Sequence, residues 1–88
     1  MTGMGKTGEA GAMRDRARRV LQASAVEAYG RAGAYVTRDS VMHRANVADP
    51  EEFLAIVEYL YGEGWVADGN EDYSYFVVTP EGMAEATR

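Results

Sequence analysis

Cysteine is absent from this 88-residue chain, histidine and tryptophan each occur once, and no apolar run approaches the ~18 residues of a membrane span. Without cysteine, no disulfide can stabilise a small core, so stability has to come from packing. The N-terminal residues lack the apolar segment of a signal peptide. We therefore expect a cytoplasmic protein that makes no contact with a membrane.

Residue types that support catalysis or metal binding are equally sparse. With His43 as the sole histidine, a transition-metal site would depend on carboxylates alone. Residues 5–7 lack the leading glycine and the strand of a phosphate-binding loop. The acidic segment 68–72 has the spacing of a calcium loop, but Tyr73 stands where the turn needs glycine. No serine or threonine has a recognisable base and orienting group, so we expect no enzymatic activity, metal or cofactor.

Basic residues are nearly absent from the second half of the chain. Residues 1–48 contain eight basic and four acidic residues, whereas residues 49–88 contain ten acidic residues and one basic residue, Arg88. The net charge of -5 therefore conceals a strong polarity along the sequence. Such polarity bears on partners and association rather than on fold.

The N-terminal part of the chain divides into a tail and a helix. Residues 1–11 include four glycines and few large side chains, which predicts a flexible tail before a domain over 12–88. From about Ala12 a helical spacing of three and four relates Met13, Ala17, Val20, Leu21, Ser24, Ala28 and Tyr29. This helix is expected to end near Gly30 or Gly33.

The middle of the chain predicts a short strand and two helices. Residues 34–36 are β-prone, and a short helix over 41–45 can be capped by Thr37, Asp39 or Ser40. The segment 49–52 then supplies a capping carboxylate, a proline at the first helical position and two acids facing the helix dipole. A third helix therefore starts there and carries the apolar residues Phe53, Leu54, Ile56, Val57, Leu60 and Tyr61.

The C-terminal segment predicts a β-hairpin and a last helix. Residues 65–67 and 73–78 are strand-like and flank the polar turn 68–72. Thr79-Pro80-Glu81 repeats the cap signal and opens a helix through Ala86. We expect Trp65 to be largely buried at the corner between the third helix and the hairpin. The fold class is α+β.

Residues 35–86 resemble the winged helix-turn-helix family of small bacterial and archaeal regulators. The resemblance rests on Val36-Thr37-Arg38-Asp39-Ser40-Val41, Leu60-Tyr61-Gly62-Glu63-Gly64-Trp65-Val66 and Tyr75-Phe76-Val77-Val78-Thr79-Pro80-Glu81-Gly82. It implies a three-helix core with a β-hairpin wing and a short C-terminal helix. It also implies binding of duplex DNA, with the third helix in the major groove and the wing against the backbone or the minor groove.

The charges of the third helix depart from that family pattern, because the helix has no basic residue and phosphate contacts dominate DNA affinity. The candidate nucleic-acid-binding residues are Arg38, His43, Arg44 and Tyr59. The candidate partner-binding residues are Glu51, Glu52, Glu58, Asp68, Glu71 and Asp72.

Two functions therefore stay open. One is a DNA-binding transcriptional regulator with weak non-specific affinity for duplex DNA. The other is an interaction module that holds a basic protein through its acidic surface. Whether Arg14, Arg18, Arg38 and Arg44 converge beside the third helix would separate the two. We also expect a homodimer in which the first and last helices pack across a two-fold axis.

Overall fold

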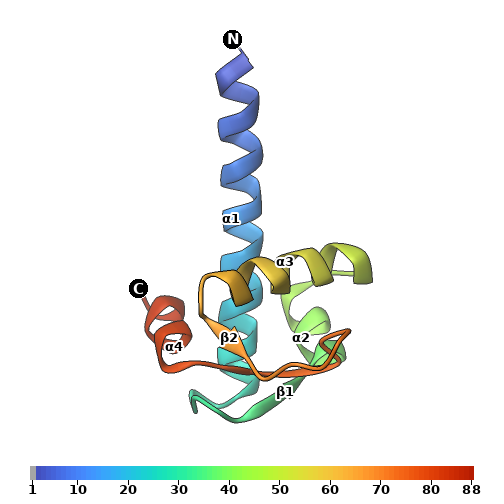
Figure 1. Ribbon diagram of the computed structural model, residues 1–88, viewed down its shortest axis with the longest axis vertical. Coiled ribbons are helices and arrows are strands. Elements are labelled where there is room, and N and C mark those ends of the chain that lie inside the picture. Colours follow the sequence, from blue (N-terminus) through green and yellow to red (C-terminus); the bar gives the residue numbers. More distant parts are fainter. Residues whose placement is uncertain (1) are drawn as a thin grey trace.

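Within residues 2–88, which the structure describes, four helices and a three-stranded antiparallel sheet follow one another in the predicted order (Figure 1). The computed structural model describes the backbone of residues 2–88 and the side chains of residues 11–88. The elements are α1 (Thr2–Glu27), β1 (Tyr35–Thr37), α2 (Arg38–Ala45), α3 (Pro50–Gly62), β2 (Val66–Ala67), β3 (Tyr75–Val78) and α4 (Pro80–Ala86). The α+β class predicted from the sequence is confirmed.

Helix α1 forms the centre of the helical layer and contacts α2, α3 and α4. Its predicted apolar face is buried at Ala17, Val20, Leu21, Ser24 and Ala28. The Ser24 hydroxyl donates a hydrogen bond to the Val20 carbonyl at 2.7 Å, so this buried polar group is satisfied. Helix α1 begins at Thr2 rather than near Ala12 as predicted. The flexibility predicted for residues 1–11 stays a prediction. No helix in the described residues is both long and apolar enough to cross a membrane.

The end of α1 differs from the prediction of a glycine cap. Tyr29 adopts the left-handed conformation (φ 55°), and its N–H donates to the Val26 carbonyl while the Gly30 N–H donates to the Ala25 carbonyl. This pair of bonds is a Schellman motif with tyrosine in the position that glycine usually takes. The reversal turns Tyr29 into solvent, 89% exposed, rather than onto the predicted apolar face.

Helices α2, α3 and α4 start at predicted capping residues. Thr37 accepts from the Ser40 N–H at the start of α2, and Asp49 accepts from the Glu51 N–H at the start of α3. Thr79 likewise accepts from the Gly82 N–H at the start of α4. These side chains satisfy N–H groups that the first helical turn leaves without partners.

The sheet has the order β1-β3-β2, with Val36 opposite Phe76 and Val66 opposite Val78. These four side chains are buried in the core cluster with the inner residues of α1 and α3. The Phe53 and Phe76 rings lie 6.3 Å apart and connect α3 to the central strand.

Trp65 is half-buried rather than largely buried as predicted. Trp65 follows Gly64, whose left-handed backbone (φ 81°) turns the chain away from the end of α3. The backbone N–H of Trp65 donates to the Leu60 carbonyl at 3.0 Å. Its ring packs against the core but also lines a cavity between helices, which leaves part of the indole accessible.

Candidate partner-binding surface

Helix α3 presents three kinds of side chain around its axis. Phe53, Ile56, Val57 and Leu60 are buried in the core. Glu52 and Tyr59 are half-buried: Glu52 pairs with Arg16 of α1, and Tyr59 packs against the core beside Trp65. Glu51, Ala55, Glu58 and Tyr61 are exposed. The exposed part of the helix is therefore acidic and aromatic.

The hairpin turn is held by its own polar side chains. The Asn70 amide donates to the Ser74 hydroxyl at 2.7 Å, and its Oδ1 accepts from the Tyr75 N–H at 3.3 Å. Asp72 accepts from the Ser74 N–H at 3.1 Å. This hydrogen bond is the first cause of a lowered pKa for Asp72, and the charge of Arg38 contributes as well. Asp68 and Glu71 are exposed and make no ion pair with a described residue.

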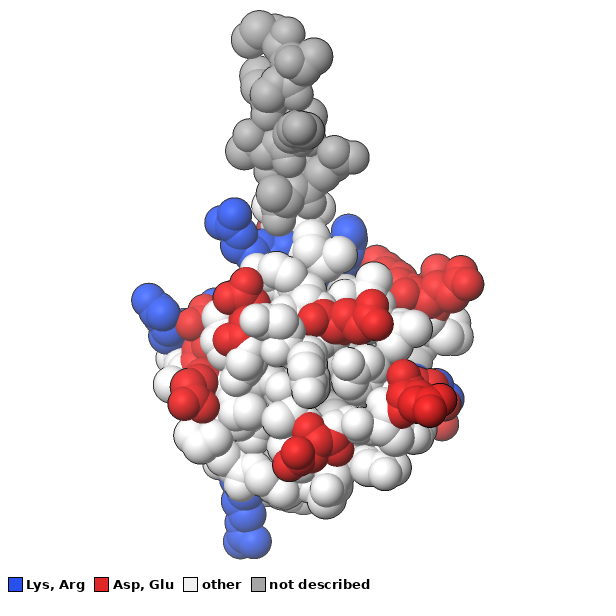
Figure 2. Space-filling model, viewed as in Figure 1, with Lys and Arg blue, Asp and Glu red and all other residues white. Residues whose placement is uncertain are grey.

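Helix α3 and the hairpin together form a surface that we name the acidic face. Figure 2 views the molecule from this side and shows acidic side chains spread across it, with most of the visible basic side chains near its margins. The acidic face comprises Glu51, Glu58 and Tyr61 of α3 and Asp68, Glu71 and Tyr73 of the hairpin.

Two tyrosines join the two halves of the acidic face. The rings of Tyr61 and Tyr73 lie 6.3 Å apart, and Tyr61 is 53% exposed. Burial raises the pKa of Tyr73 above its usual value, and the nearby charge of Glu58 raises it further. Tyr73 has a φ of 54°, and its ring lies so close to Gly69 that a Cβ there would come within 2.9 Å of the ring's Cε1 atom. A bulky residue in this backbone region is uncommon and marks a position worth testing for function.

The arginines do not converge beside α3. Arg38 lies 3.5 Å from a carboxylate oxygen of Asp39 and 3.6 Å from one of Asp72. Arg44 pairs with Glu27 of α1 at 2.6 Å. Arg18 pairs with Glu85 of α4 at 3.2 Å rather than with a neighbour on its own helix. Arg14 lies at a cavity between α1, α3 and α4.

Several predicted site residues therefore have other surroundings than the sequence suggested. Tyr59, a candidate nucleic-acid-binding residue, faces α1 instead of a nucleic acid, because its position falls on the side of α3 that packs there. Glu52 and Asp72 are held in ion pairs within the chain. His43 is exposed on α2, and the described residues contain no group of three or more metal-binding side chains.

Tyr61 and Tyr73 were not among the candidate site residues. Tyr61 was predicted among the apolar residues of the third helix, but its side chain is 53% exposed. It stands three residues after Glu58, so helical spacing places it on the same exposed side of α3. No local signal marks Tyr73, whose orientation depends on the turn. Comparison of the chain with protein-family models, with curated proteins and with solved structures found no match.

Proposed function

We propose that this chain is a winged-helix interaction module that binds a basic protein segment through its acidic face. The helix pair α2 and α3, followed by the hairpin and the sheet order β1-β3-β2, is compatible with the winged-helix arrangement. In that arrangement α3 and the hairpin wing are the elements that meet a partner.

The observation that carries the proposal is the charge of those two elements. Glu51, Glu58, Asp68 and Glu71 are exposed and make no ion pair with a described residue, so their charges are open to a partner. Phosphates would be repelled by this surface, whereas lysine and arginine would be attracted to it. The aromatic pair within the acidic rim matches the anatomy of protein interfaces, where tyrosine anchors and charged margins are common.

Titration of a short peptide of alternating arginine and lysine tests the acidic face. Tyr61→Ala is expected to weaken binding about tenfold, since it removes an aromatic anchor. Glu58→Gln is expected to weaken it about twofold to fivefold, the range of an exposed charge pair. The matched controls are Tyr35→Ala, an exposed tyrosine on β1, and Glu81→Gln, an exposed acid on α4. If the variants and their controls lost the same affinity for the peptide, the acidic face would have no special role in binding, and the proposal would be refuted.

The second candidate function is binding of duplex DNA. The arrangement of α2, α3 and the hairpin favours it, but the charges of α3 and the hairpin do not. We expect it to be poorer than about micromolar at physiological salt, with a shallow salt slope from roughly two to four phosphate contacts per subunit. Arg38→Ala and Arg44→Ala should remove most of it, although each arginine would first have to leave its carboxylate. Tight binding of random-sequence duplex with a steep salt slope would favour the regulator over the interaction module.

We also propose a homodimer built on α1 and α4. A shallow groove between them is lined by Ala25, Val26 and Ala86, and it continues to Tyr29 at the end of α1. Val26 is 52% exposed, and covering it together with Tyr29 would bury apolar surface that the monomer leaves in water. Sedimentation at micromolar concentration should give about twice the 9.6 kDa of one chain, and Val26→Glu should restore the monomer. A wild-type mass of 9.6 kDa would contradict the proposal.

A further inference from the structure

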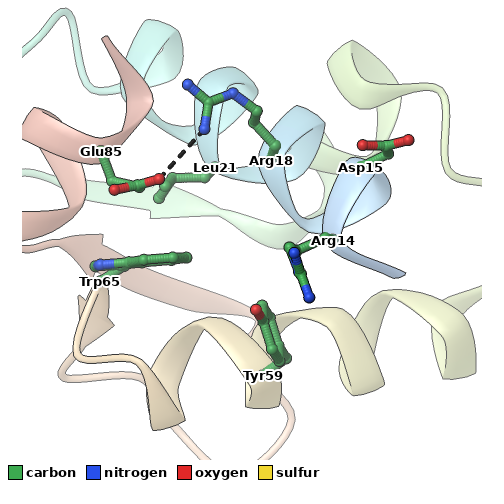
Figure 3. Close-up of a pocket in the computed structure, with 7 residues that line it drawn as sticks. All are labelled: Arg14, Asp15, Arg18, Leu21, Tyr59, Trp65 and Glu85. Carbon is green, nitrogen blue, oxygen red and sulfur yellow. Dashed lines mark hydrogen bonds and ion pairs between the residues drawn. The ribbon is translucent and has the colours of Figure 1, made fainter. Parts of the chain in front are cut away.

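A cavity of about 140 Å³ lies between α1, α3 and α4, and none of its lining residues belongs to the acidic face (Figure 3). Its apolar walls are Leu21 of α1, Tyr59 of α3 and Trp65 of the segment that follows α3. The Tyr59 and Trp65 rings meet nearly edge to face, with centroids 6.4 Å apart and planes inclined at 78°. The two rings therefore form an aromatic corner that is open to the cavity.

One pair of charges at the cavity is already satisfied within the chain. Arg18 pairs with Glu85 at 3.2 Å and also donates to the Arg88 carbonyl at 2.8 Å. The second oxygen of Glu85 lies 3.1 Å from the Arg88 guanidinium. Because both oxygens of Glu85 are engaged, this carboxylate is poorly placed to recognise a bound cation.

The other cation at the cavity, Arg14, has different surroundings. Arg14 is exposed and makes no ion pair with any residue whose side chain is described. Figure 3 shows its guanidinium directed toward Tyr59 at the cavity, whereas the Asp15 carboxylate points away from Tyr59 and Trp65. The cavity thus combines an aromatic corner with one available guanidinium.

We propose that this cavity binds a small aromatic carboxylate. A cavity of about 150 Å³ with apolar walls accommodates benzene, so the volume here suits a single ring. The ring would lie against Leu21, Tyr59 and Trp65, and the carboxylate would take two parallel hydrogen bonds from Arg14. Such a ligand would touch α1, α3 and the segment leading to the sheet. The proposal does not rest on the partner proposed for the acidic face, because the two sites share no residue.

Trp65 is the chain's single tryptophan and lines the cavity, so its fluorescence reports occupancy directly. Titration with benzoate should change the emission saturably, with a Kd on the order of 1 mM for so small a ligand. Arg14→Gln should raise that Kd about tenfold through loss of the charge-assisted hydrogen bonds. Arg19→Gln is the matched control, because Arg19 is an exposed arginine of α1 that does not line this cavity.

One neutral and one cationic ligand of similar size test whether the cavity prefers an anion. Benzyl alcohol and benzylammonium should each bind about tenfold more weakly than benzoate. Equal binding of benzyl alcohol, or tighter binding of benzylammonium, would overturn the assignment of an anion site. A linear, non-saturating decrease in emission, equal to that of free N-acetyltryptophanamide, would show collisional quenching only and would also overturn it. Circular dichroism of Arg14→Gln should match the wild type, since the side chain is exposed.

Discussion

Replacing Gly82 with alanine tests how α4 is seated on the rest of the molecule. Gly82 is buried in the first turn of α4. A Cβ at this position would overlap the backbone carbonyl oxygen of Trp65 and would lie 2.9 Å from both the Trp65 carbonyl carbon and Val78 Cγ1. The Trp65 carbonyl cannot easily move, because it accepts a hydrogen bond from the Thr79 N–H at 3.0 Å.

The expected magnitude is a sum of opposing effects. In a helix, alanine is favoured over glycine by about 0.5–1 kcal/mol. Overpacking against fixed backbone costs about 1–3 kcal/mol, and weakening the bond between Thr79 and Trp65 adds about 1 kcal/mol. Gly82→Ala should therefore lower the free energy of unfolding by about 1–3.5 kcal/mol. For a domain of this size the melting temperature would fall by roughly 4–28 °C.

Gly62→Ala provides the matched control, because Gly62 is also helical and a Cβ there would meet no atom within 4 Å. It should raise stability by about 0.5–1 kcal/mol. Thermal and urea unfolding would be followed by circular dichroism at one protein concentration, since the proposed dimer would make the midpoint concentration-dependent. If Gly82→Ala were as stable as the wild type, α4 could not be seated against the Trp65 carbonyl.

Three further predictions concern backbone strain and titration. In the monomeric Val26→Glu background, Tyr29→Gly should raise the free energy of unfolding by about 0.5–1 kcal/mol, because the exposed tyrosine is held at φ 55°. A loss of stability in urea unfolding of that monomer would contradict this account. The pKa of Asp72 is lowered by the hydrogen bond from the Ser74 N–H, so the carboxylate stabilises the fold above about pH 4 and this effect is lost as the pH falls. The difference in free energy of unfolding between the wild type and Asp72→Asn, measured by urea unfolding, should therefore narrow in acid. The pKa of Tyr73 is raised by burial, so its contribution to the free energy of unfolding is complete below about pH 10 and is lost above it. In alkali, the Tyr73→Phe variant should therefore lose less stability than the wild type. Equal losses would exclude Tyr73 as the cause of alkaline destabilisation.

Local signals determined most of the element order in advance. The caps at Thr37, Asp49 and Thr79 each satisfy N–H groups within three residues, so their effect can be read from a few neighbouring letters. The buried face of α1 was predicted from the spacing of its apolar residues. The turn between the two hairpin strands was predicted from its run of polar residues. The acidity of α3 and the hairpin was likewise evident from composition alone.

Only the tertiary structure decided which charges are available and where the cavity lies. Arg18 and Glu85 are 67 positions apart in the chain, and no local pattern relates them. Periodicity placed Tyr29 on the buried side of α1, but the chain reversal at that residue turned its ring into solvent. Trp65 was expected to be buried, yet the junction of three helices leaves a hollow beside its ring. Helix caps and apolar periodicity act over a few residues, whereas ion pairs and cavities depend on how distant elements pack in space.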